Sequence, residues 1–201
     1  MTTFYYAPGT CALAVRIALE EAQLPYTLER LDFASAQQRS PEYLAINPQG
    51  RVPALVTQEG VITETPALLA YVAQICPQAQ LAPATPFGFA RMQELNSYLA
   101  STVHVAHAHR LRGNRWADDP AAIAAMQRKV SANMRDCFAY LEMQYLQGPW
   151  VLGEQFTVSD AYLFTVSTWL KNDDVDIAQF PKVQAHQQRM LARPSVQRAM
   201  A

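Results

Sequence analysis

Hydrophobic and polar residues follow two different patterns along this chain, and the change falls near residue 77. Before it, short runs rich in aromatic and branched residues alternate with stretches at helical spacing. The predicted strands cover residues 3–6, 26–33, 52–56 and 61–63, and the predicted helices cover residues 12–24, 40–46 and 65–75. A strand–helix–strand unit implies a parallel pair with a right-handed crossover, and the turn at 58–60 predicts a hairpin. Residues 1–77 are therefore expected to form an α/β domain.

After residue 77 the pattern is helical. Residues 78–86 are rich in proline and lack periodicity, which is typical of a linker. Helical spacing then covers residues 87–112, 120–146 and 161–170, and Pro181 and Pro194 open two further short helices. The 161–170 segment is apolar nearly all round and is preceded by Thr157 and Asp160 at the spacing of a capping box, which predicts a central, buried helix. Residues 87–201 are therefore expected to form an all-helical domain.

Composition and charge narrow the class of protein. Of the 201 residues, 50% are hydrophobic and 16% are charged, and the formal net charge is −1, which indicates a globular protein without the basic surface that nucleic acids require. The three cysteines have neither a disulfide framework nor a metal-ligand spacing. The chain begins without a signal-peptide pattern and has no apolar run of membrane-spanning length. We expect a cytoplasmic protein with reduced thiols, no metal, no nucleic-acid partner and no membrane partner.

Cys11 follows the turn Pro8-Gly9-Thr10 and precedes a predicted helix. Free N–H groups and the helix dipole at such a position stabilise a thiolate and lower its pKa, which favours a reactive cysteine. A small buried residue at a tight turn is the alternative interpretation.

Two further segments have a pattern suited to ligand binding. Val52-Pro53 lies at the start of a predicted strand, where a cis peptide bond would leave the Val52 N–H and C=O as a free edge for an extended peptide. Glu64 and Thr65 stand at the start of a helix, where free N–H groups bind a carboxylate and Glu64 can pair with an ammonium group. An ordinary edge proline and a simple helix cap are the alternatives.

Three histidines, His104, His107 and His109, lie close together on the first helix of the second half. The spacing of His104 and His107 permits metal binding, but no other ligand accompanies them. Proton transfer by a histidine is the favoured hypothesis because the ordinary pKa of imidazole is near neutral. Solvated or packing roles remain open for His107 and His109.

Taken together, these segments resemble a bacterial glutathione S-transferase, and the cysteine turn is similar to the beta class in particular. The matching segments are Tyr5–Cys11, Asn47–Leu55, Glu64–Thr65, the proline-rich linker and Phe156–Phe164. The resemblance implies the glutathione transferase fold, in which a thioredoxin-like domain with the glutathione site precedes an all-α domain.

The resemblance also implies roles for individual residues. It implies a cis bond before Pro53, pairing of the Val52 backbone with the cysteinyl part of glutathione, and binding of the γ-glutamyl end by Glu64 and Thr65. Cys11 matches the sulfur that meets the glutathione thiol.

The same resemblance extends to the second domain and to the subunit arrangement. His104 matches a histidine near the thiol, and Tyr6 matches the tyrosine before the cysteine turn. Ser101 matches a position that reaches glutathione across the interface of a homodimer.

The chain departs from the beta-class pattern at three places. Ala12 replaces a usual serine, Val105 replaces a common lysine, and residues 32–38 lack another lysine. Loss of two cations weakens the expected anchoring of the glutathione carboxylates, for which Arg51 or Arg39 are the candidate replacements.

The leading hypothesis is an enzyme of detoxification that uses glutathione as co-substrate. It either conjugates glutathione to a hydrophobic electrophile or exchanges thiols and disulfides through Cys11, with assistance from His104. Trp169 is a candidate for the hydrophobic-substrate side, with core packing as its alternative. A non-catalytic ligand- or protein-binding member of the same fold is the second hypothesis. A thioredoxin-type reductase is disfavoured because the chain has no Cys-x-x-Cys.

Overall fold

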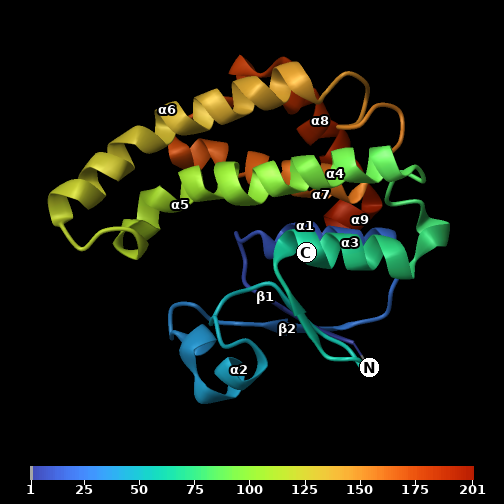
Figure 1. Cartoon of the computed structure of the whole chain (residues 1–201), viewed down its shortest axis with the longest axis horizontal. Helices are drawn as coiled ribbons and strands as arrows, with labels where there is room; N and C mark the ends of the chain where they lie inside the picture. The colour runs from blue at the N-terminus through green and yellow to red at the C-terminus, as the bar shows by residue number, and fades with distance from the viewer. Residues whose placement is uncertain (1) are drawn as a thin grey trace.

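A computed structural model describes residues 2–201. The first domain contains β1 (Thr3–Tyr6), α1 (Ala12–Glu21), β2 (Thr27–Arg30), α2 (Pro41–Ile46), β3 (Ala54–Val56), β4 (Val61–Thr63) and α3 (Thr65–Ile75). Its sheet has the order β2-β1-β3-β4, with β1 and β2 parallel and the other neighbours antiparallel. Helices α1 and α3 lie between the sheet and the helical domain, and α2 lies on the far side in this view (Figure 1). The predicted parallel pair and hairpin are confirmed.

Several predicted boundaries in this domain are wrong. Helix α1 ends at Glu21 because Gln23 adopts a positive φ of 52° and the chain closes with bonds from the Gln23 N–H to Glu20 and from the Leu24 N–H to Leu19. The strand predicted over residues 26–33 covers only Thr27–Arg30. The strand predicted from residue 52 begins at Ala54, since Pro53 has no N–H to donate to the sheet.

The second half contains α4 (Pro86–Tyr98), α5 (His104–Arg112), α6 (Pro120–Gln144), α7 (Val158–Ser167), α8 (Pro181–Leu191) and α9 (Pro194–Met200). The helix predicted over 87–112 is divided, because residues Leu99–Val103 (η3) form a π-helical turn between α4 and α5. The start of the predicted linker is also ordered, with a short 3₁₀ helix, η2 (Pro77–Ala79). The Leu81 carbonyl accepts a hydrogen bond from the Val158 N–H at 2.9 Å, which attaches the linker to α7.

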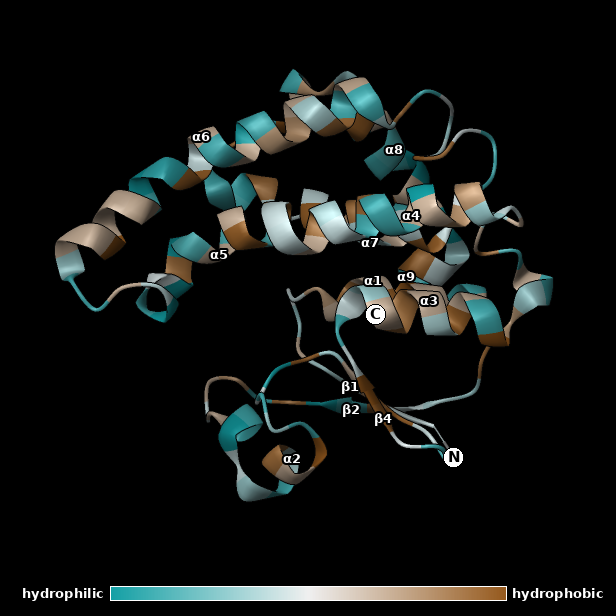
Figure 2. Cartoon of the chain, in the orientation of Figure 1, coloured by the Kyte–Doolittle hydropathy of each residue, from teal (hydrophilic) through white to brown (hydrophobic). Residues whose placement is uncertain are grey.

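Helix α7 is the centre of the molecule, as its uniform apolarity predicts. Every residue of α7 is buried, and α1 packs against it from the first domain. By contrast, α6 alternates between hydrophobic and hydrophilic residues along its length, as expected of a helix with one exposed face (Figure 2). The capping box is confirmed: the Asp160 carboxylate accepts from the Thr157 N–H at 2.7 Å. The packing of α1 against α7 fixes the Cys11 turn against the helical domain.

Candidate functional site

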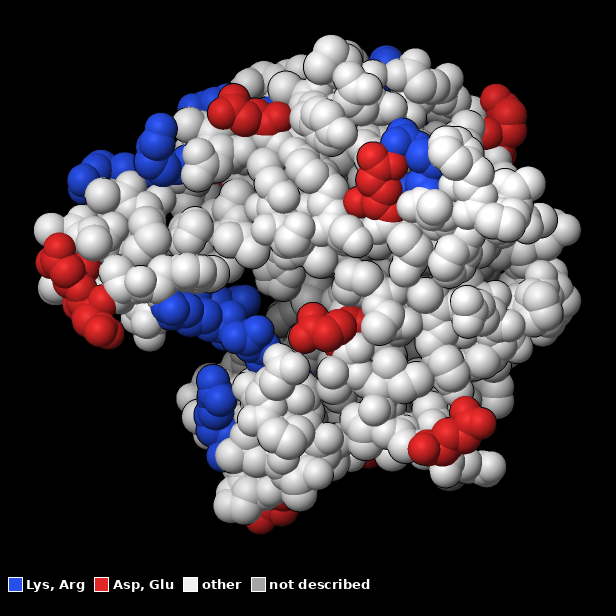
Figure 3. Space-filling view, in the orientation of Figure 1, with Lys and Arg blue, Asp and Glu red and all other residues white. Residues whose placement is uncertain are grey.

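A cavity of about 640 Å³ lies between the two domains. Its lining includes Cys11, Phe33, Arg39, Arg51, Val52, Pro53, Glu64, Thr65, His104, His107, Arg112, Arg115, Trp116, Tyr162 and Trp169. In the space-filling view, Lys and Arg side chains face the hollow from both sides, and an acidic side chain lies beside them (Figure 3). Most of the site residues predicted from the sequence are thus brought together.

Cys11 precedes the first turn of α1 and is 6% exposed. Its Sγ lies 3.9 Å from the Val52 carbonyl oxygen, which joins the cysteine turn to the segment before β3. Burial raises the pKa of the Cys11 thiol, and the neighbouring Thr65 hydroxyl only partly offsets this effect. The expected low pKa is therefore wrong for this structure. At neutral pH the group is a thiol and a weak hydrogen-bond donor.

The backbone N–H of Val52 is available to a ligand. The Val52–Pro53 bond is cis, and the Val52 N–H has no hydrogen-bond partner within residues 2–201. The preceding residue is fixed, because the Arg51 carbonyl accepts from the Tyr43 hydroxyl at 2.6 Å and from the Asn47 amide at 2.8 Å. A held backbone with a free N–H at the edge of a cavity suits an extended peptide.

Glu64 occupies a strained conformation at the start of α3. Its φ of 67° and ψ of 121° lie in a region that residues other than glycine rarely adopt. Such strain costs about 1–3 kcal/mol and is concentrated at ligand sites. The next residue, Thr65, is buried beside Cys11, so a carboxylate, a hydroxyl and a helix N-terminus meet at one end of the cavity.

His104 follows directly after the π turn and lines the cavity at the start of α5. Burial lowers the pKa of His104 to about 4, and the positive charges of Arg112, His107 and other neighbours add to this effect. The imidazole is therefore neutral at pH 7, in contrast to the near-neutral pKa expected from the sequence. A neutral ring offers one donor and one acceptor nitrogen rather than a stored proton.

Trp169 lies between two histidines on the helical side. Its ring centroid is 5.1 Å from that of His104 and 4.5 Å from that of His107, on which it stacks. His107 Nδ1 is 2.7 Å from an oxygen of the buried Asp173 carboxylate, and this contact fixes the position of the imidazole ring. His107 therefore has a structural partner and also lines the cavity.

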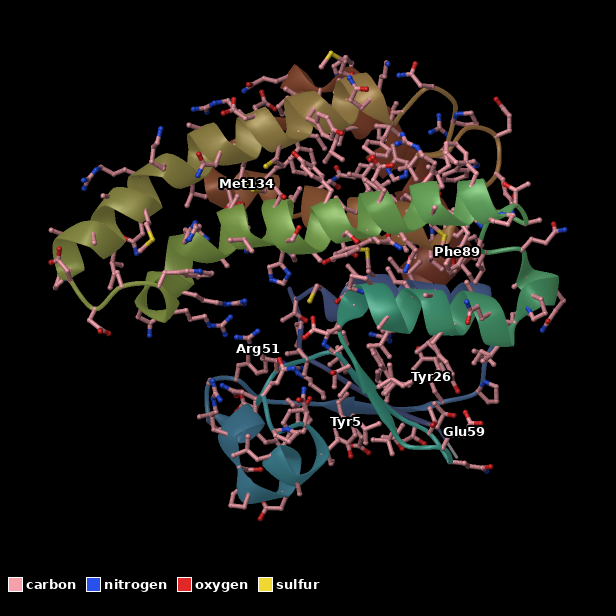
Figure 4. The ribbon with its side chains drawn as sticks, in the orientation of Figure 1. Tyr5, Tyr26, Arg51, Glu59, Phe89 and Met134 are labelled. Carbon is pink, nitrogen blue, oxygen red and sulfur yellow. The ribbon has the colours of Figure 1, made fainter. Side chains whose placement is uncertain are left out.

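Four arginines line the cavity, two from each domain. Arg39 and Arg51 come from the first domain, and Arg112 and Arg115 come from the end of α5 and the 3₁₀ turn η4 (Gly113–Arg115). Figure 4 shows Arg51 at the edge of the first domain that faces α5. The sequence lacks two lysines of the beta-class pattern, and these four arginines supply positive charge to the same cavity.

Two predicted site residues lie outside the cavity lining. Tyr6 packs against the core, with the Arg16 guanidinium 5.4 Å from its ring centroid. Ser101 is exposed, and its hydroxyl donates to the Ser97 carbonyl at 2.8 Å. The catalytic role of Tyr6 and the role of Ser101 across a dimer interface stay predictions.

The sequence interpretation did not identify the arginines of the helical domain or the aromatic side chains of Phe33 and Trp116. A signal for the former was present, because the stretch between Glu94 and Asp118 contains no acidic residue but holds three arginines. No local signal places Phe33 in the cavity.

Within residues 2–201, no three His, Cys, Asp or Glu side chains are grouped so as to hold a metal ion. No helix in the described part of the chain is both long and apolar enough to cross a membrane.

Comparisons with known proteins agree with this geometry. The family model of the glutathione S-transferase N-terminal domain matches residues 1–74, and a family model of the glutathione S-transferase C-terminal domain matches residues 109–201. Glutathione S-transferase GstA of Escherichia coli O157:H7 is 31% identical over 200 residues, which cover 98% of this chain and 96% of the relative.

Two solved structures have the same fold over almost the whole chain. A glutathione transferase homolog from Sulfitobacter, with bound glutathione, is 50% identical with a TM-score of 0.96, covering 98% of this chain and 96% of the other. A beta-class glutathione S-transferase of Sphingomonas chungbukensis is 30% identical with a TM-score of 0.84 and the same coverage. The predicted fold class is confirmed, and the chain belongs to the glutathione S-transferase family.

Proposed function

We propose that this protein binds glutathione along Val52 and activates its thiol for transfer to an electrophilic substrate. The cysteinyl part pairs with the free Val52 N–H, while Glu64 binds the ammonium group and the start of α3 receives the γ-glutamyl carboxylate. Arg39 and Arg51 are placed to receive the glycine carboxylate, since both lie on the same domain as Val52. The support for this assignment is the convergence of these groups in one cavity.

The state of Cys11 defines its role in this mechanism. Because its thiol is protonated, Cys11 donates a hydrogen bond to the glutathione sulfur and stabilises the thiolate. Neutral His104 provides a second polar contact at the same place. The glutathione thiolate attacks the electrophilic carbon, a C–S bond forms, and the leaving group departs with the electron pair of the bond that breaks.

Thiol–disulfide exchange is the second candidate activity, because Cys11 Sγ lies beside the glutathione-binding edge. Here Cys11 loses its proton to solvent and its thiolate attacks a disulfide, forming a mixed disulfide and releasing one thiolate. The raised pKa of Cys11 disfavours this route at neutral pH. The hypothesis of a non-catalytic binding protein rested on absent cations and loses that support, since four arginines line the cavity.

The observation that carries the proposal is the convergence of these groups in one cavity, where Cys11 Sγ lies 3.9 Å from the Val52 carbonyl oxygen. Its test compares wild type with Cys11→Ala in two assays, conjugation of 1-chloro-2,4-dinitrobenzene and reduction of a glutathione mixed disulfide. We expect Cys11→Ala to lower the rate of conjugation about tenfold at neutral pH, because a hydrogen bond to a charged sulfur contributes about 1.5 kcal/mol. The pH profile of conjugation should shift to higher pH, since the glutathione thiolate loses that hydrogen bond.

The control is Cys76→Ala, which removes another buried thiol outside the cavity. Full conjugation by Cys11→Ala with loss of disulfide reduction would assign the protein to exchange instead. Failure of the wild type to bind glutathione at millimolar concentration in calorimetry would contradict both activities.

We further propose that the protein works in the cytoplasm as a homodimer of the beta class and serves detoxification. The Cys11 turn and His104 support the class assignment, and the exposed Ser101 is available to a partner subunit. Light scattering after size exclusion tests the dimer, because a monomer at micromolar concentration would leave Ser101 without its predicted role.

A further inference from the structure

The charge of the cavity is strongly unbalanced. Among the described residues that line it, four arginine side chains are matched by a single carboxylate, that of Glu64. Glutathione brings two carboxylates, a thiolate and an ammonium group, so the bound cavity remains positive. This residual charge favours a second ligand that is itself an anion.

The excess positive charge lies on the side of the cavity that the helical domain forms. Once Arg39 and Arg51 have received the glycine carboxylate, Arg112 and Arg115 face the remaining space without an assigned partner. Neither guanidinium forms an ion pair or hydrogen bond within residues 2–201. Burial lowers the pKa of Arg115, and repulsion from Arg112, Arg51 and Arg39 lowers it further, which agrees with a cluster of like charges.

The segments that carry these arginines are held by close packing at two glycines. A Cβ on Gly113 would lie 2.9 Å from Ile123 Cγ2, so only glycine lets the turn after Arg112 pack against α6. A Cβ on Gly50, where φ is +60°, would lie 2.7 Å from the Gln38 carbonyl oxygen. The backbones that position these side chains are therefore fixed, and the Arg39 guanidinium also donates to the Gln49 carbonyl at 3.3 Å.

Aromatic side chains line the same cavity as the unpaired cations. Trp116 and Phe33 line the cavity while 47% and 39% exposed, and Trp169 lies deeper. The Trp116 ring contacts His109 edge-on, with 4.4 Å between ring centroids. Exposed aromatic groups next to guanidinium groups suit a ligand with a flat apolar body and an acidic end.

The reacting centre is close to the same arginines. Arg112 and Arg115 are both among the charges that lower the pKa of His104, which lines the cavity together with Cys11. A carboxylate held by these arginines therefore places the rest of the molecule near the glutathione sulfur.

We infer that the second substrate is an organic acid, in which a carboxylate bound by Arg112 and Arg115 accompanies an electrophilic aromatic or unsaturated group packed against Trp116. The inference rests on the proposed function and names the substrate class of that site. With an aryl chloride as substrate, the glutathione thiolate attacks the ring carbon that bears chlorine, the C–S bond forms, and chloride leaves with the bonding electrons.

The test uses a matched pair of aryl chlorides, 4-chloro-3-nitrobenzoate and 4-chloro-3-nitrobenzamide. Each kcat/KM is divided by the uncatalysed rate with glutathione, which removes the difference in intrinsic reactivity. The variants are Arg112→Gln, Arg115→Gln and the double variant. Arg128→Gln is the control, because Arg128 is an exposed arginine of α6 outside the cavity lining. Affinity for unreactive S-methylglutathione is measured by calorimetry.

We expect wild type to prefer the benzoate about tenfold or more, and the double variant to lose that preference. The benzamide rate of each variant is the baseline for its own benzoate rate, and affinity for S-methylglutathione should stay within about twofold of wild type. Equal normalised rates for the two chlorides in wild type would overturn the inference. So would loss of S-methylglutathione affinity in the double variant, which would assign Arg112 and Arg115 to glutathione itself.

Failure of the proposed function has a different signature, namely no S-methylglutathione binding and no conjugation of either chloride. In that case, direct binding of the benzoate and benzamide to wild type and to the double variant decides the inference. Tighter binding of the benzoate to wild type alone would support it, and equal binding would overturn it.

Discussion

At the scale of single residues, tertiary burial changes the chemistry of both candidate catalytic groups. Cys11 stands at a helix start, which favours a thiolate, yet burial raises its pKa. His104 has an ordinary pKa of 6.5, yet burial lowers it to about 4. Both groups are therefore neutral at pH 7, so they do not form a preformed ion pair.

The neutral state of His104 predicts a pH dependence of stability. Because the unfolded chain takes up this proton near pH 6.5 and the folded chain only near pH 4, stability is present above pH 6.5 and is lost as pH falls between these values. Between pH 7.5 and 4.5, we expect the free energy of unfolding to fall by about 2 kcal/mol less in His104→Gln than in wild type. Urea unfolding of both proteins at pH 7.5 and 4.5 measures it, and an identical pH dependence in the two would contradict the assignment.

At the scale of elements, the start of α7 depends on one buried carboxylate. Asp160 accepts from the Val151 N–H at 2.8 Å, from the Thr157 N–H at 2.7 Å and from His186 Nε2 at 3.0 Å, and it is fully buried. It therefore fixes the loop before α7 and joins α7 to α8. The bonds to backbone groups satisfy donors that would otherwise be buried without partners.

We expect Asp160→Asn to lower the free energy of unfolding by about 3 kcal/mol, because the amide turns an N–H₂ group toward backbone donors. Thermal unfolding measures the change, with Asp136→Asn as the control, since Asp136 is an exposed residue of α6. A decrease below about 1 kcal/mol would show that the loop is held by other contacts.

At the scale of the whole molecule, the two domains are joined through α1. The Glu21 carboxylate accepts from Arg193 Nε at 2.6 Å and Nη2 at 2.8 Å and also from the Ser195 hydroxyl, which connects α1 to α9. Burial acts to raise the pKa of Glu21, but these donors outweigh it and the pKa is lowered. The pair thus stabilises the fold above pH 4.5, and the effect is lost as pH falls through the lowered pKa.

Removal of Arg193 should weaken this connection. We expect Arg193→Ala to lower the free energy of unfolding by about 2 kcal/mol, because the guanidinium is paired in bidentate geometry and also covers the Phe156 ring at 4.2 Å. Arg198→Ala is the matched comparison, since its pair with Glu20 is more exposed, and it should cost less than about 1 kcal/mol. Denaturant unfolding at pH 7 measures both, and equal effects would contradict the argument.

The sequence predicts most of the architecture because its signals are local. The strand and helix spacings, the prolines that open α3, α8 and α9, and the Thr157–Asp160 box all act within a few residues, so each is visible without a partner. Boundaries that depend on turn geometry, such as the positive φ of Gln23, were predicted incorrectly. The π turn before His104 has no local signature, and the helix across it was predicted as continuous.

By itself, the sequence determined the order of elements, an α/β half followed by an all-helical half, because short-range patterns carry that information. Its resemblance to a known family implied the fold class and the grouping of Cys11, Val52 and Glu64. Only the tertiary structure decided the ionisation of Cys11 and His104, since burial and charge from distant segments set a pKa. It alone placed Arg39 and Arg51 opposite Arg112 and Arg115. Long-range electrostatics of this kind depends on how the domains meet, which no local spacing encodes.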